Sequence, residues 1–182
     1  MVTSYGSTYH HGDARAALTR AALDLARAGG PRTVTLRAAA RDVGVTATAV
    51  YRHFANVEEL LDAAKGRALA LLAERLDAAP RNGPNTAAGA RVHAVAEGYL
   101  AFARECPGLF GMACHGGLDP VRELVADRIG ARRPGVGLAV WSAAHCVAIL
   151  AVEGSLSGVS EDEQLACLAQ AIDLVLAGAG GT

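Results

Sequence analysis

The chain has 182 residues, 52% of them hydrophobic, and a formal net charge of −1, so it can bury a core and is not disordered. No stretch holds about 18 uninterrupted apolar residues, which argues against a membrane-spanning protein. Because the N-terminus also lacks the basic-then-apolar layout of a signal peptide, we expect a cytoplasmic protein without membrane partners.

Capping residues and glycines divide the first third of the chain into three predicted helices. Asp13 is placed to cap the first, Thr35 to cap the second and Thr46 to open the third. Gly44 suits a left-handed turn between the second and third helices. The helices are expected over residues 14–28, 36–43 and 46–55.

The remainder of the chain also has helical periodicity. A long amphipathic helix is expected over residues 57–79, followed by a linker at 80–84 that contains two prolines. Further helices are expected over residues 86–105, 108–115, 119–129, 137–156 and 161–178. The predicted fold is therefore all-α, with a three-helix helix-turn-helix head on a larger helical bundle. The expected divisions are the head (1–55), a connecting helix (56–79) and the body (80–182).

The third predicted helix separates apolar from polar side chains. Val50 and Phe54 are four residues apart and are expected to pack on the first two helices. The outward residues have side chains that suit DNA, because threonine and alanine methyls contact thymine, arginine pairs with guanine, and tyrosine hydroxyls bind phosphate. These outward residues are Ala47, Thr48, Tyr51 and Arg52. An ordinary solvated helix remains the alternative.

The charge distribution favours DNA binding at the head. Residues 1–55 hold seven arginines against three aspartates, a charge of +4, whereas residues 56–182 carry −5. A basic end on an acidic body indicates that one end meets a polyanion, although scattered charge would give the same totals.

The stretches YHHGDARAALTRAALDLARAGG and TLRAAARDVGVTATAVYRHFANVEELLDAA resemble the DNA-binding domain of the TetR family of bacterial transcriptional regulators. The resemblance runs from about Tyr9 to Leu72 and implies a double-stranded operator as partner. Many family members carry a lysine where this chain has Val57, so a phosphate contact there is in doubt. By the resemblance, the DNA contacts would be Thr35, Arg37, Thr46, Ala47, Thr48, Tyr51, Arg52 and His53.

Bulky side chains in the body predict either a ligand pocket or a core. Trp141 and His145 lie four residues apart on one helical face, and an apolar wall with one imidazole suits a small organic ligand. Phe102, Phe110 and Met112 would supply the other apolar groups. The alternative is that all five are core residues.

The same region resembles the WHG-type C-terminal domain of one TetR branch, although Cys146 stands where that domain has glycine. The resemblance implies control by a ligand and homodimerisation, most often as a repressor that the ligand releases from a palindromic operator. An activator remains an alternative. The last two predicted helices carry more apolar residues than one helix pair can bury, which also favours a dimer over a purely intramolecular core.

Other chemistry receives little support from the sequence. The four cysteines (Cys106, Cys114, Cys146 and Cys167) contain no CxxC pair and are expected to be free, buried thiols. No metal site, cofactor or catalytic residue is predicted, because zinc-ligand spacing, GxSxG, P-loop and HExxH motifs are lacking. A metal-responsive or thiol-redox regulator stays an alternative, and a helical enzyme is a weaker one.

Overall fold

The computed structural model describes residues 11–79, 89–130, 134–156 and 158–180, in which every regular element is helical. The predicted all-α class is confirmed. The head contains α1 (His11–Gly29), the short 3-10 helix η1 (Pro31–Thr33), α2 (Leu36–Val43) and α3 (Ala47–Val50). The rest consists of α4 (Val57–Asp77), α5 (Ala90–Glu105), α6 (Pro107–Ala113), α7 (Asp119–Ile129), α8 (Pro134–Val152) and α9 (Glu161–Gly180).

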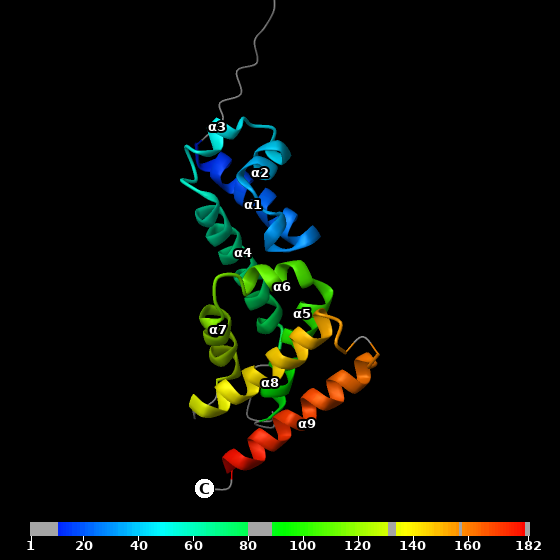
Figure 1. Ribbon diagram of the computed structural model, residues 1–182. Helices are drawn as coiled ribbons and strands as arrows, with labels where there is room; N and C mark the ends of the chain where they lie inside the picture. The colour runs from blue at the N-terminus through cyan, green and yellow to red at the C-terminus, as the bar shows by residue number, and fades with distance from the viewer. Residues whose placement is uncertain (1–10, 80–88, 131–133, 157, 181–182) are drawn as a thin grey trace, which may run out of the picture.

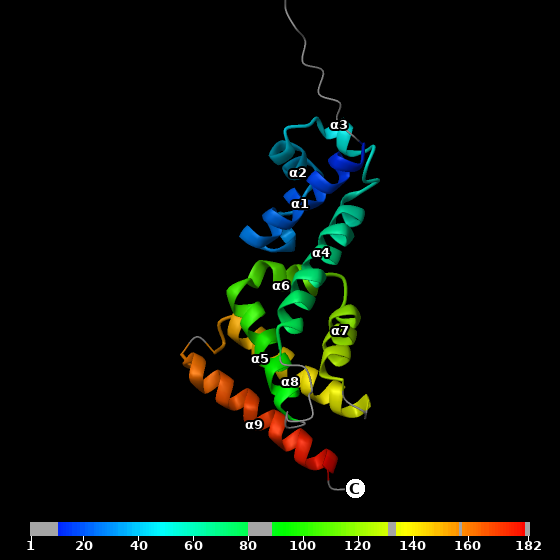
Figure 2. The same cartoon turned by 180° about the vertical axis from the view of Figure 1, so that it is seen from behind.

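The molecule is elongated, with the head at one end and the body at the other (Figure 1). α4 runs from the head into the body, and α6 crosses beneath the C-terminal end of α1. The reverse view shows α8 and α9 side by side at the end of the molecule away from α3 (Figure 2).

Two predicted helix boundaries in the head are wrong. α3 ends at Val50 and is followed by a tight turn, in which Arg52 N donates to Ala49 O at 3.3 Å and His53 N donates to Val50 O at 2.8 Å. α1 begins at His11, two residues before Asp13, the position predicted to precede the helix. The predicted start at residue 86 of the helix now seen as α5 falls outside the described residues.

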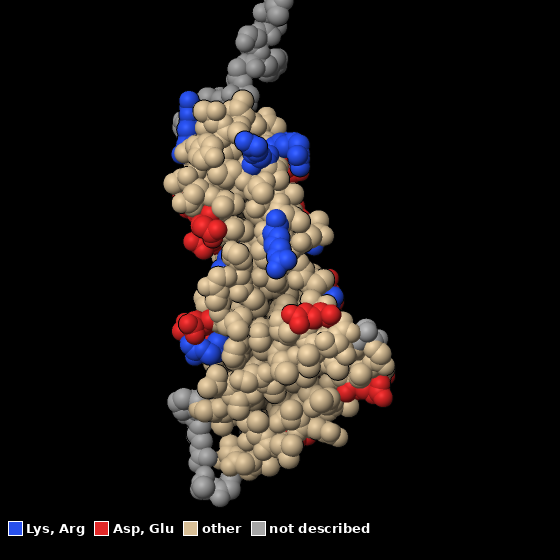
Figure 3. Space-filling model, viewed as in Figure 1, with Lys and Arg blue, Asp and Glu red and all other residues tan. Residues whose placement is uncertain are grey.

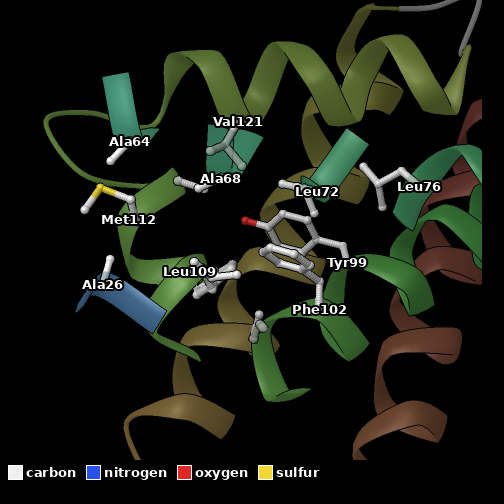
Figure 4. Close-up of a cluster of buried hydrophobic side chains, with 14 of the residues drawn as sticks. Ala26, Ala64, Ala68, Leu72, Leu76, Tyr99, Phe102, Leu109, Met112 and Val121 are labelled. Atoms are coloured by element: carbon white, nitrogen blue, oxygen red, sulfur yellow. The ribbon is translucent and has the colours of Figure 1, made fainter. Parts of the chain in front are cut away.

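One continuous hydrophobic core joins the head to the body along α4. Leu60, Ala64, Ala68 and Leu72 lie on one face of α4 and are fully buried. Figure 4 shows this face packed against Tyr99, Met112 and Val121. The amphipathic pattern predicted for this helix therefore places its apolar stripe against both parts of the molecule.

A glycine allows α6 to approach the C-terminal end of α1 closely. A methyl group on Gly108 would lie 2.7 Å from the carbonyl oxygen of Arg27 and closer still to that of Ala26. Ala26 is fully buried and lies beside Leu109 of α6 (Figure 4). Only hydrogen fits at position 108, so α6 and the head share a backbone contact rather than a layer of side chains.

α8 carries an unusual amount of exposed apolar surface. Its segment Gly135–Val152 has a mean hydropathy of 1.9 and is 28% buried, and it is long and apolar enough to cross a membrane by length and composition alone. The core helix of a soluble protein meets the same criterion, so one such helix is weak evidence for a span. Leu138 on α8 and Leu174 on α9 are 49% and 75% exposed.

The backbone contact at Gly108 predicts a loss of stability in Gly108→Ala. Because the added methyl group would overlap two carbonyl oxygens, we expect unfolding free energy to fall by about 1–3 kcal/mol in urea denaturation. Gly66→Ala is the matched control, since Gly66 lies within α4 with open space around it and should gain about 0.5–1 kcal/mol. Equal effects of the two substitutions would contradict the contact.

Candidate nucleic-acid interface and buried aromatic cluster

The turn between α2 and α3 has the geometry that the sequence predicts. Thr35 Oγ1 accepts from Ala38 N at 3.0 Å, and Thr46 Oγ1 accepts from Ala49 N at 3.2 Å, so both threonines cap helices. Gly44 has φ 76° and ψ 28°, the left-handed conformation that glycine adopts without strain. These local interactions set the angle at which α3 leaves α2.

α3 and the turn after it have one buried and one exposed side. Val50 and Phe54 are fully buried against the rest of the head. Tyr51 is 60% exposed, and His53 is half-buried. The other predicted DNA contacts (Thr35, Arg37, Thr46, Ala47, Thr48 and Arg52) are exposed. The structure therefore leaves seven of the eight predicted side chains open to solvent.

Residues far apart in the sequence meet beside the first turn of α2. Thr35, Arg37 and Tyr51 line a shallow groove of about 420 Å³, which Asn56 and Val57 at the start of α4 complete. Asn56 caps α4 by accepting from Glu59 N at 3.0 Å. The N-terminal ends of α2 and α4 therefore both face this groove, and unpaired amides at helix N-termini attract phosphate.

Arg15 fixes the turn after α3, a role that the sequence did not reveal. Its guanidinium donates to the carbonyl of His53 and to Glu59 Oε1 at 2.9 Å, and lies 4.3 Å from the centroid of the Phe54 ring. Glu59 also accepts from Ala55 N at 2.8 Å. The Ala55 N–H, and then Arg15, lower the pKa of Glu59. Arg15 thereby links α1, the turn and α4.

Basic side chains gather at the α3 end of the molecule. On the face shown in Figure 3, most charged side chains over the head are blue, whereas both signs are present from α4 downward. This arrangement agrees with the charge of +4 on residues 1–55 and −5 on the rest. A polyanion would therefore be drawn to the end that carries α3.

Four rings from three helices form an aromatic cluster in the body. Tyr99 of α5 makes an edge contact with Phe110 of α6 at 5.5 Å between ring centroids. On α8, Trp141 stacks on His145 at 5.1 Å with an interplanar angle of 17°. His145 lies 5.9 Å from Phe110. Tyr99 was not among the predicted pocket residues, although it lies in the region that resembles the WHG-type domain.

Polar atoms meet at the centre of this cluster. Tyr99 Oη lies 2.8 Å from His145 Nδ1, and Trp141 Nε1 is buried without an acceptor among the described residues. Burial lowers the pKa of His145 and raises that of Tyr99, so the pair is neutral and Tyr99 can donate to the imidazole. The cluster is therefore a buried, uncharged hydrogen-bonding site.

The predicted pocket residues pack as a core in this structure. Phe102, Phe110, Met112 and Trp141 are each at most 9% exposed, and His145 is half-buried. Phe110, Trp141 and His145 meet in the aromatic cluster described above. Phe102 lies beside Tyr99, and Met112 faces α4 (Figure 4). A ligand at this site would have to displace packed side chains.

The expectation that all four cysteines are buried is wrong. Cys106 and Cys114 are half-buried, whereas Cys146 and Cys167 are exposed on α8 and α9. Burial raises the pKa of Cys114 to about 11, so its thiol is protonated at neutral pH and a poor redox sensor. Among the described residues, no three His, Cys, Asp or Glu side chains group as a metal site requires.

Comparisons with known proteins agree with the helix-turn-helix geometry. Residues 18–64 match the family of bacterial regulatory proteins, tetR family. No curated protein matches the chain. A solved tetR-family transcriptional regulator from Streptomyces coelicolor is 26% identical with a TM-score of 0.70, over 92% of this chain and 81% of that chain.

Two solved structures from Rhodococcus sp. RHA1 are also similar. A protein of unknown function is 26% identical, with a TM-score of 0.70, over 94% of this chain and 98% of that chain. A TetR-like transcriptional regulator is 17% identical, with a TM-score of 0.65, over 95% and 99% of the two chains. The second likeness shows the fold alone.

The buried imidazole of His145 predicts a loss of stability in mild acid. Since its pKa in the folded chain is below the ordinary 6.5, the unfolded chain binds more protons as the pH falls below that value. Between about pH 7 and pH 5, unfolding free energy should therefore fall more in the wild type than in His145→Gln. Urea denaturation at both pH values measures the difference, and an equal fall in the two proteins would contradict it.

Proposed function

Because this chain belongs to the TetR family of bacterial transcriptional regulators, we propose that it is a homodimeric repressor that binds a palindromic operator and is released by a small organic ligand. Regulators of this family are soluble DNA-binding proteins, and we place this one in the cytoplasm. The function is that of a transcription factor rather than an enzyme. The observation that carries the proposal is the division of α3 into a buried side and an exposed side.

The proposed reading surface consists of α3 and the turn after it. Ala47, Thr48 and Arg52 would face base edges in the major groove, with Arg52 suited to guanine. Thr46, Tyr51 and His53 would contact the flanking backbone. On the far side of the groove described above, Thr35 and Arg37 would hold a phosphate at the start of α2.

A second copy of the chain would cover the exposed apolar surface of α8 and α9. Leu138, Val152 and Leu174 are all more than one-third exposed, and patches of this kind mark protein contacts. A two-fold pair of bodies would present two copies of α3. A palindromic operator requires these to be about 34–36 Å apart, one turn of DNA.

The aromatic cluster lies close enough to the head to control it. Phe110 contacts both Tyr99 and His145, and Gly108, two residues earlier on α6, touches the last carbonyls of α1. A ligand that separates the rings would therefore shift α6 against the head. Such a ligand can weaken DNA binding only to the extent that it binds the shifted arrangement of α6 more tightly than the arrangement that binds DNA.

Arg52→Ala tests the reading surface. If the guanidinium pairs with guanine, operator affinity should fall by about 1–3 kcal/mol and preference should relax at one base position. Arg32→Ala is the charge-matched control, because Arg32 is exposed in η1, the short helix that contacts α6 of the body. Mobility-shift titrations on the operator and on single-base variants measure both. Equal effects of the two substitutions would contradict the assignment.

Leu174→Glu tests the dimer surface. A charge on this 75% exposed side chain should leave the fold intact but shift the chain to monomer in sedimentation equilibrium, because a buried, unpaired carboxylate is costly. Leu118→Glu, at a side chain 38% exposed just before α7, should leave the dimer unchanged. A wild-type chain that is monomeric at all concentrations would refute the homodimer.

A further inference from the structure

The head contains an apolar cavity that shares only Arg52 and His53 with the proposed DNA contacts. It lies between α1, the turn at Gly44 and α3, and its volume is about 220 Å³. Leu18 is 1% exposed and Ala14 7%, so the α1 wall of the cavity belongs to the core of the head. The lining residues are Ala14, Leu18, Val43, Val45, Ala49, Arg52 and His53.

The cavity combines apolar walls with one positive charge. Five of its seven lining residues are aliphatic, whereas Arg52 is exposed. Among the described residues, Arg52 forms no hydrogen bond or ion pair with another side chain, unlike Arg15, which is held by Glu59. The surrounding head is basic, so its field favours an anion beside Arg52.

We propose that this cavity binds a small organic carboxylate, with a single ring or a short branched chain inside it and the carboxylate on Arg52. The size agrees, because an empty apolar cavity of about 150 Å³ is enough to hold benzene. It is too small for the drug-sized molecules that fill pockets above about 300 Å³. Guanidinium and carboxylate form strong, paired hydrogen bonds.

A carboxylate in this position competes with DNA. It occupies the guanidinium assigned to base recognition and lies against Ala49 on the inner side of α3. This consequence rests on the proposed function, whereas the binding itself does not. The cavity is also separate from the aromatic cluster, since none of its lining residues comes from the body.

Calorimetric titration of the full chain without DNA tests the site. The probes are benzoate, benzyl alcohol with the same ring but no charge, and acetate with the same charge but no ring. Benzoate should bind once per chain, at least about tenfold more tightly than either of the others. Benzoate at constant ionic strength should also weaken operator binding in a mobility shift.

Two variants attribute the binding to the cavity. Ala14→Leu fills the space and should weaken benzoate at least about tenfold, whereas Ala28→Leu adds the same side chain at an exposed position of α1 and should not. If Ala14→Leu does not fold, Arg52→Gln at the exposed rim serves instead. It should reduce the affinity for benzoate to that for benzyl alcohol.

Several outcomes would overturn the proposal. These are no heat with benzoate at millimolar concentration, equal affinities for benzoate and benzyl alcohol, and unchanged binding in a folded Ala14→Leu or in Arg52→Gln. If the chain binds its operator but does not bind benzoate, the cavity site alone is refuted. A chain that binds benzoate as expected but no specific DNA would refute the proposed function alone.

Discussion

The close approach of Gly108 to the last carbonyls of α1 is the constraint on which the relation between head and body depends. Any larger residue at this position would force the two helices apart. One end of the seven-residue α6 therefore touches α1 of the head, and Phe110 of the same helix lies in the aromatic cluster. α4 lies beside α6 and has one face buried along its length. The head therefore packs against two helices, α4 and α6, and is not joined to the body by a linker alone.

Within the head, Arg15 has a comparable role. It joins α1 to the His53 carbonyl and to Glu59 of α4, and so fixes the turn that carries Tyr51 and Arg52. A shift of α4 relative to α1 would strain this link. The proposed repressor therefore has two physical connections between its body and its DNA-facing turn, one through α6 and α1 and one through α4 and Arg15.

The features predicted correctly are those that depend on neighbours along the chain. Thr35 and Thr46 cap helices by accepting from backbone amides three residues later in the chain. Gly44 adopts the left-handed conformation of the turn, and Val50 and Phe54, four residues apart, are both buried in the core of the head. The early end of α3 was not predictable, because the turn after it is held by Arg15, 38 residues before His53.

Long-range packing explains the other differences. Tyr99 was not among the predicted pocket residues, because its contacts form only when α5, α6 and α8 meet. Cys146 and Cys167 were expected to be buried because free thiols usually act as small hydrophobes, but both are exposed, on α8 and α9. The predicted pocket residues do gather in the body, but as a packed core in this structure.

Selection of bound sequences from a pool of random duplex DNA, followed by footprinting, tests the proposed operator binding most directly. We expect one palindromic sequence, with two protected major-groove segments centred about 34–36 Å apart on one side of the duplex. Binding without sequence preference, or protection of a single half-site by the full chain, would contradict a homodimer that binds DNA through two copies of α3.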